Sequence, residues 1–238
     1  MTPLQALLTN LIDYAGLYPP ASLQLPEVIR NYERYLASPD NWMLNRLVLP
    51  ESKLIAVKPG EAWRITLLTD HDPGPLPPQI ETLETKGVRR LSLPTYCEAP
   101  LDQITDAFAK IRTGGVTPDA IPPAPELAGF LHQAAARRLP FKATAGLHHP
   151  IRAGMHGFIN VFVAAAFAWY GMDRESLTLV IEESHASAFE FGDKHLRWRG
   201  LELSTDQIRT ARRDFAHSFG SCSFEEPLED LRKLGWLQ

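Results

Sequence analysis

The chain has 238 residues, of which 45% are hydrophobic and 22% are charged, a balance typical of a globular protein with a sizeable core. Its formal net charge is −4, with lysines and arginines scattered along the chain. This argues against general nucleic-acid binding, which uses a concentrated basic face. The length suits one α/β domain and no linker interrupts the chain, so we expect residues 1–238 to form a single domain.

The sequence shows no pattern for export, membrane insertion or cofactor binding. Its first residues lack a secretory signal, and its longest apolar run, residues 157–172, is too short to span a bilayer. Cys97 and Cys222 lie far apart and have no metal-binding or redox spacing. We therefore expect a cytoplasmic protein that binds neither a membrane nor a cofactor, and the sequence permits a homo-oligomer.

The N-terminal third begins with helical patterns and then changes to alternating short segments. Thr2 and Pro3 predict the start of a first helix, and Pro26 that of a second. Beyond them, apolar runs predict strands and amphipathic stretches predict helices. We expect strands over residues 45–49, 64–69, 88–93, 107–112, 141–145 and 177–182, and helices over residues 52–57, 78–86 and 125–137, after Met155, and after a capping box at Ser204.

Alternating strands and helices indicate parallel strands joined by crossovers. Two weaker strand segments, residues 14–18 and 189–198, bring the number to eight. We therefore predict a (β/α)8 TIM-like barrel, preceded by an extra N-terminal helix. An open doubly wound sheet is the alternative, and the barrel is favoured because no Gly-rich phosphate loop follows the first strand.

The strongest candidate for a binding site is the segment that begins at Lys110. In a strand, Lys110 and Arg112 share one face, and we expect both to point into the barrel, where an anion or carboxylates must compensate them. Gly114 and Gly115 follow with exposed backbone N–H groups suited to phosphate or carboxylate. The alternative is a structural ion pair across the barrel.

A second lysine-bearing strand repeats the pattern. Lys142 and Thr144 share one face, and His148, His149 and Arg152 follow in the next loop. Side chains at the C-terminal ends of barrel strands form the active mouth of such barrels. We expect Thr144, His149 and Arg152 to bind substrate and His148 to transfer protons, although a histidine in such a loop can simply bond a loop carbonyl.

Three further residues complete the predicted site. Glu182 ends the predicted strand 177–182 and is a candidate general acid or base. Ser221 belongs to a Gly/Ser-rich turn, residues 217–227, whose N–H groups suit an anion pocket. Asp13 adds a polar group to the substrate-binding set.

Lysines close together inside a barrel suggest Schiff-base chemistry. A lysine beside other cations has a depressed pKa, which suits a nucleophile. The two lysine strands are similar to those of the deoxyribose-phosphate aldolases, in which one lysine forms an imine and a second lowers its pKa. This similarity implies Lys142 or Lys110 as nucleophile and does not choose between them. The leading hypothesis is a lyase of the aldolase type that acts on a small phosphorylated or carboxylated carbonyl compound.

Two other classes of function remain open. A metal-dependent hydrolase or isomerase would use His148, His149 and a carboxylate as metal ligands. The same scaffold could instead serve a non-catalytic protein that binds a small anion.

Four motifs taken together resemble those of a family of uncharacterised bacterial proteins. The resemblance covers nearly the whole chain, extends to the N-terminal stretch at residues 11–20, and implies no activity. The motifs are KIRTGG at residues 110–115, FKATAGLHHPIR at 141–152, HGFINV at 156–161 and FGSCSFEEP at 219–227.

Overall fold

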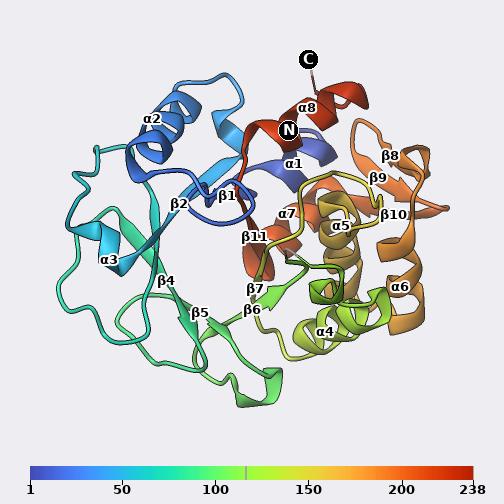
Figure 1. Ribbon diagram of the computed structural model, residues 1–238. Coiled ribbons are helices and arrows are strands. Elements are labelled where there is room, and N and C mark those ends of the chain that lie inside the picture. The colour runs from blue at the N-terminus through green and yellow to red at the C-terminus, as the bar shows by residue number, and fades with distance from the viewer. Residues whose placement is uncertain (116, 238) are drawn as a thin grey trace.

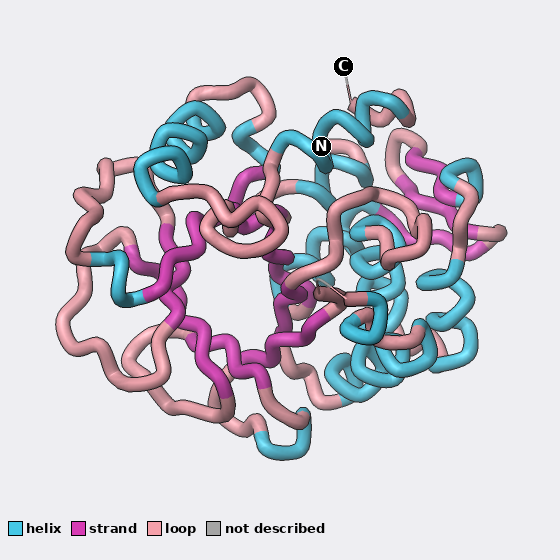
Figure 2. The backbone as a smooth tube through the Cα atoms, in the orientation of Figure 1, coloured by secondary structure: helices cyan, strands magenta, loops and turns pink. Residues whose placement is uncertain are grey.

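The computed structural model describes residues 1–115 and 117–237 and contains a closed barrel of eight parallel strands. Viewed along the barrel axis, the strands form the magenta ring of Figure 2. Their order is β1-β11-β7-β6-β5-β4-β3-β2, which confirms the predicted TIM-like barrel. The barrel strands are β1 (Ile12–Tyr14), β2 (Leu44–Pro50), β3 (Ile65–Leu68), β4 (Ile80–Lys86), β5 (Thr95–Glu98), β6 (Phe108–Arg112), β7 (Phe141–Thr144) and β11 (Ala216–Ser221).

Helices and a small antiparallel sheet surround the barrel unevenly. Figure 1 shows α4 to α7 and the small sheet gathered on the side of β6, β7 and β11, whereas loops and the short α3 lie on the side of β4 and β5. The helices are α1 (Pro3–Leu8), α2 (Leu25–Leu36), α3 (Glu51–Leu54), α4 (Ala124–Ala136), α5 (Phe158–Trp169), α6 (Arg174–Glu182), α7 (Thr205–Asp214) and α8 (Glu225–Lys233), and the small sheet is β8 (Phe189–Phe191), β9 (His195–Trp198) and β10 (Leu201–Ser204).

Local signals explain where several helices begin. The hydroxyl of Thr2 accepts a hydrogen bond from the backbone N–H of Gln5, whose side chain accepts one in return, which forms a capping box before α1. Ser204 forms the same box before α7, as predicted. The alanine-rich α5 is buried along nearly its whole length, and its Phe158 ring stacks on Phe219 of β11.

Three predicted segments have a different structure from the one expected. Residues 78–86, predicted as a helix, form β4, because pairing with β3 and β5 outweighs the helical propensity of their glutamates and lysine. Residues 88–93, predicted as a strand, form a loop, and β5 follows it. Residues 177–182, also predicted as a strand, lie in α6, where Asp173 caps the first turn through Ser176 N–H.

The two weak strand predictions also differ from the structure. The strand predicted at residues 14–18 is β1, which begins and ends earlier. Residues 189–198 form β8 and β9, which pair antiparallel outside the barrel. The eighth barrel strand is β11, which overlaps the first part of the segment that the sequence predicts as a Gly/Ser turn, residues 217–227. Its Phe219 packs outward on α5, and its Ser218 bonds inward to Asp13.

No helix within residues 1–115 and 117–237 has both the length and the apolar character needed to cross a membrane.

Candidate active site at the carboxyl end of the barrel

The two lysine-bearing strands lie side by side and present their lysines at the same height. Lys110 of β6 is opposite Lys142 of β7 in the strand register, and Arg112 is opposite Thr144. Both lysine side chains are buried, with exposed fractions of 7% and 1%. Both contact the same carboxylate, Glu84, so they project inward as the strand alternation predicts.

Lys142 is held between two buried carboxylates. Its Nζ lies 2.5 Å from Asp13 Oδ2 of β1 and 2.5 Å from Glu84 Oε1 of β4, and 5.6 Å from the centre of the Tyr96 ring. Burial by itself lowers the pKa of Lys142, but attraction to Asp13 and Glu84 outweighs it and raises that pKa above its usual value. The expectation of a depressed pKa at Lys142 is therefore wrong, because these carboxylates, not cations, are its nearest neighbours.

Lys110 lies between the carboxylate of Glu84 and that of Glu98, which is nearer to the carboxyl end of the barrel. Its Nζ lies 3.2 Å from Glu84 Oε2 and 3.1 Å from Glu98 Oε2, at the end of β5. Arg112, at the end of β6, donates from Nε to Glu98 Oε1 at 2.7 Å. Three cations therefore alternate with three carboxylates, and the site is charge-balanced rather than cationic as predicted. We call this set the charged cluster: Asp13, Glu84, Glu98, Lys110, Arg112 and Lys142.

Asp13 is fixed by hydrogen bonds at both carboxylate oxygens. Ser218 Oγ donates to Oδ2 at 2.8 Å, while Asn45 Nδ2 and the backbone N–H of Arg46 donate to Oδ1 at 2.6 and 3.1 Å. Burial by itself raises the pKa of Asp13, but Lys142 and these donors outweigh it and lower the pKa. The carboxylate therefore stays ionised and holds one orientation, as a preorganised partner for Lys142.

A tyrosine from the loop after β1 brings an unpaired hydroxyl close to the charged cluster. The phenol oxygen of Tyr18 is buried, yet no residue that the structure describes bonds to it. Burial, together with the charge of Glu84, raises the pKa of Tyr18, so the phenol stays protonated. A buried hydroxyl without a partner is unfavourable. A ligand oxygen near Lys142 would satisfy it.

The glycines after β6 have a packing role that the sequence does not reveal. A Cβ on Gly114 would lie 2.8 Å from the Cα of Gly146, in the loop after β7. Next to them, Thr113 N–H donates to the Thr144 carbonyl. The two loops at this end of the barrel therefore touch backbone to backbone. Gly115 is similarly close to Ala120, and the predicted binding of an anion at Gly114 and Gly115 stays a prediction.

The histidines of the loop after β7 pair with α8 rather than with the charged cluster. His148 Nδ1 lies 3.2 Å from Glu226 Oε2, and His149 Nδ1 lies 2.6 Å from Asp230 Oδ2. No group of three or more His, Cys, Asp or Glu side chains in the described parts of the chain is arranged to hold a metal ion. The side chains expected to form a metal site therefore do not converge.

Three other predicted site residues lie apart from the charged cluster. Glu182 is exposed at the end of α6, so it does not end a barrel strand as predicted. Ser221 accepts a hydrogen bond from Ser223 N–H and shares the outward side of β11 with Phe219. The backbone N–H of Arg152 donates to Asn160 at the start of α5, a contact that shapes the loop.

Sequence reasoning missed two carboxylates and the tyrosine. Glu84 was overlooked because residues 78–86 resemble a helix. Glu98 was overlooked because it is the last residue of β5, and this strand was predicted too early in the chain, at residues 88–93. The β-branched residues Ile80, Thr82 and Thr85 are the signal that favours a strand here, and in a strand Thr82 and Glu84 share one face.

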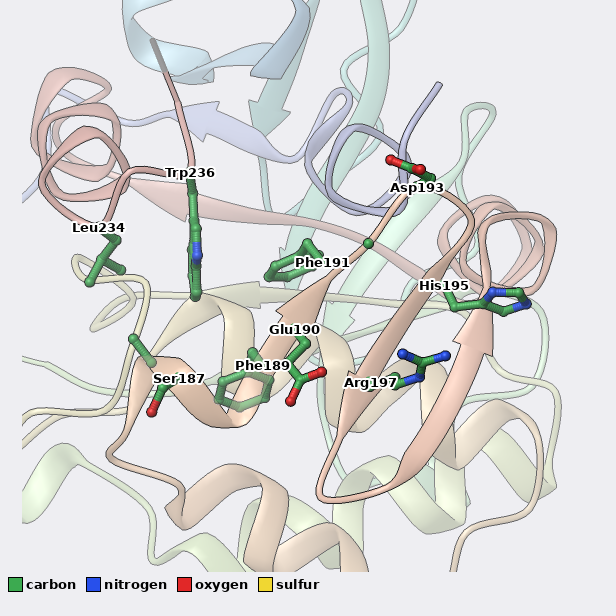
Figure 3. A pocket seen from close by; sticks show the side chains of 11 residues that line it. Ser187, Phe189, Glu190, Phe191, Asp193, His195, Arg197, Leu234 and Trp236 are labelled. Carbon is green, nitrogen blue, oxygen red and sulfur yellow. The ribbon is translucent and has the colours of Figure 1, made fainter.

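The structure also has a cavity of about 620 Å³, which lies beside the small antiparallel sheet (Figure 3). Phe189, Phe191 and Trp236 line it together with polar side chains such as Glu190 and Arg197. None of its lining residues belongs to the charged cluster. We place the candidate active site at the charged cluster, because buried ionisable groups held in contact are the typical feature of catalytic sites.

No protein-family model, no curated protein and no solved structure matches the chain. The functional assignment therefore depends on the geometry described above.

Proposed function

We propose that the protein is a lyase of the aldolase type, which forms an imine between a lysine and a small carbonyl compound that carries an anionic group. The observation that supports this proposal is the pair of inward lysines on adjacent barrel strands, joined through the shared carboxylate of Glu84. One lysine can act as nucleophile and the other as a fixed positive charge, and Glu84, which contacts both, can accept a proton.

Lys110 is the better candidate for the nucleophile. Lys142 is 1% exposed and lies 2.5 Å from each of two carboxylates, so it stays an ammonium ion that stabilises negative charge on the carbonyl oxygen. Lys110 has longer contacts, 3.2 and 3.1 Å, and lies nearer to the exposed Arg112. The Lys110 side chain is also more exposed than that of Lys142, at 7% against 1%.

The carboxylates around Lys110 can handle the protons of the reaction. Lys110 first gives a proton to Glu98 or Glu84, and the neutral amine then attacks the carbonyl carbon. The carbonyl oxygen takes up this proton and a second one from the nitrogen and leaves as water, which forms the iminium ion. In a substrate with a hydroxyl group on the β-carbon, a carboxylate removes the hydroxyl proton and the bond between the α- and β-carbons breaks. The β-carbon leaves as an aldehyde or ketone, and the electron pair of the broken bond passes to the iminium ion, which becomes an enamine. Protonation of the enamine and hydrolysis of the imine release the product and restore the lysine.

Arg112, Thr144 and Tyr18 are the groups best placed to bind the substrate. Arg112 and Thr144 are opposite each other at the ends of β6 and β7. The Arg112 side chain is 57% exposed and bonds Glu98 only through Nε, which leaves its terminal nitrogens for a phosphate or carboxylate. The buried phenol of Tyr18 supplies a hydrogen bond to a substrate oxygen.

Borohydride trapping tests this function directly. The protein is incubated with a panel of small phosphorylated and carboxylated aldehydes and ketones, reduced, digested and mapped by mass spectrometry. We expect a reduced adduct on Lys110 that Lys110→Met abolishes. The Lys86→Met variant, which removes an exposed lysine at the end of β4, serves as the control and should be trapped normally.

Two results would count against the proposal. An adduct on Lys142 would reverse the roles of the two lysines, and the absence of an adduct on either lysine with every compound would remove the imine mechanism.

A further inference from the structure

A second cavity, of about 560 Å³, opens at the opposite, amino end of the barrel. Its wall includes residues that precede or begin the strands, such as Asn10 before β1, Pro94 before β5 and Phe108 at the start of β6. Among its charged side chains, arginines outnumber carboxylates: Arg46, Arg64, Arg209, Arg212 and Arg213 against Glu81. None of these residues belongs to the charged cluster.

Two of the arginines are held side by side by one carboxylate. Arg46 Nε donates to Glu81 Oε2 at 2.8 Å, and Arg64 Nε donates to Glu81 Oε1 at 2.9 Å. The terminal Nη atoms of both guanidinium groups donate no hydrogen bond to any residue that the structure describes. The three side chains are only partly exposed, at 15%, 36% and 33% for Arg46, Arg64 and Glu81. Together these three side chains carry one net positive charge, and the Nη groups of the two arginines remain available to donate hydrogen bonds to a ligand.

A third arginine adds a buried positive charge without a counter-ion. Arg212 is 8% exposed, and its guanidinium donates to the backbone carbonyls of Leu7, Thr9, Asn10, Ala216 and His217. It forms no ion pair within residues 1–115 and 117–237. Burial lowers its pKa, and attraction to Asp13 offsets only part of this effect. An anion in the cavity would offset this cost.

The remaining wall is neutral and partly aromatic. His217 Nε2 contacts the carbonyl of Arg213, so this nitrogen carries the proton, and Nδ1 accepts a hydrogen bond from Tyr96 at 2.7 Å. Burial lowers the pKa of His217 to about 4, which keeps the ring neutral at physiological pH. The rings of Tyr96, Phe108 and His217 pack together and offer a surface for an organic group.

We infer that this cavity is a binding site for a small dianion of the phosphate-monoester class. The charges of Arg46, Arg64, Arg212 and Glu81 leave two positive charges to neutralise, and paired guanidinium groups with free terminal nitrogens match the oxygens of a phosphate. The two rim arginines are already paired, Arg209 with Asp206 and Arg213 with Asp214. The inference does not depend on the proposed lyase activity, although Asn45 and Arg46 of the cavity also donate hydrogen bonds to Asp13 of the charged cluster.

Titration with inorganic phosphate, at constant ionic strength set with chloride, tests the inference. Binding is followed by calorimetry and by the rise in melting temperature. We expect Arg64→Gln to weaken binding at this cavity at least tenfold and Arg64→Lys to weaken it less, since a lysine keeps the charge but loses the paired donors. Arg90→Gln, which removes an exposed arginine paired with Asp106, is the matched control and should bind as the unmodified protein does.

The variant Arg112→Gln separates this cavity from the candidate active site. Phosphate binding that Arg64→Gln weakens and Arg112→Gln leaves intact supports the inference, whatever the outcome of the trapping experiment. Circular dichroism establishes that both variants are folded before titration. Equal phosphate affinity in Arg64→Gln and the unmodified protein, or complete loss of binding in Arg112→Gln alone, would overturn it.

Discussion

Replacing Lys142 with methionine should destabilise the protein strongly and in a pH-dependent way. The substitution keeps most of the side-chain volume but leaves the buried carboxylates of Asp13 and Glu84 without their closest cation. Removing one partner of a buried ion pair costs about 3–5 kcal/mol, because the remaining charge is left without compensation. That is a large share of the roughly 5–15 kcal/mol by which a folded protein is stable.

The pH dependence distinguishes lost charge compensation from lost packing. Lys142 holds the pKa values of Asp13 and Glu84 below their usual range. Without it, burial dominates and raises these pKa values, so the carboxylates bind protons in the folded state more readily than in the unfolded state. Stability then falls as pH rises, and the deficit of Lys142→Met should shrink by about 1 kcal/mol or more between pH 7 and pH 5.

Equilibrium urea denaturation followed by circular dichroism at both pH values measures this deficit. Lys110→Met is the matched comparison. Its loss should be smaller, about 1–2 kcal/mol, because Glu84 keeps Lys142 and Glu98 keeps Arg112. Adding Glu84→Gln to Lys142→Met should restore part of the loss. A deficit below about 1 kcal/mol at pH 7, or one that is the same at pH 5, would refute this reasoning.

Three further outcomes test other features of the structure. Gly114→Ala should cost about 1–3 kcal/mol in urea denaturation, because its Cβ would lie 2.8 Å from the Cα of Gly146, whereas Gly192→Ala, with its nearest contact at 3.4 Å, should cost far less. Thr2→Ala should lower the free energy of unfolding by about 1 kcal/mol through loss of the capping box, and an unchanged value would contradict the cap. Burial lowers the pKa of His217 to about 4 in the folded protein, so as pH falls the histidine is protonated in the unfolded chain before it is protonated in the folded one. About 3 kcal/mol of stability should therefore be lost as pH falls from 6.5 toward 4. A His217→Asn variant whose stability has the same pH profile would disprove this.

The fold class could be predicted because four of the eight barrel strands carry clear signals. Strands β2, β3, β6 and β7 are short apolar runs whose alternation is visible in the sequence, and all four were predicted close to their observed bounds. The strands β4 and β11 were missed because their inward side chains are polar. Thr82 and Glu84 in β4, and Ser218 in β11, have partners on other strands, and a single stretch of sequence does not display those partners.

Only part of the candidate site was predicted: its lysines were identified, but Glu84 and Glu98 were not. The lysines were identified because a charged residue inside an apolar strand is unusual, and their shared face follows from the geometry of a strand. The pKa shift of Lys142 was predicted with the wrong sign, because it depends on Asp13 and Glu84, which come from two other strands. Glu182 was misplaced because residues 177–182 were predicted as a strand. The spacing of Leu177, Val180 and Ile181 also fits a helix, and the observed helix α6 buries these residues and leaves Glu182 exposed.

The uneven cover of the barrel has a mechanical consequence for the charged cluster. Lys110 and Lys142 stand on β6 and β7, on the side of the barrel where α4 and α5 lie, whereas Glu84 and Glu98 stand on β4 and β5, where loops and the short α3 lie outside (Figure 1). The two carboxylates and the two lysines therefore stand on parts of the barrel wall that are covered differently. We expect the wall formed by β4 and β5 to exchange its amide hydrogens faster than the wall formed by β6 and β7, so that Glu84 and Glu98 move relative to Lys110 and Lys142.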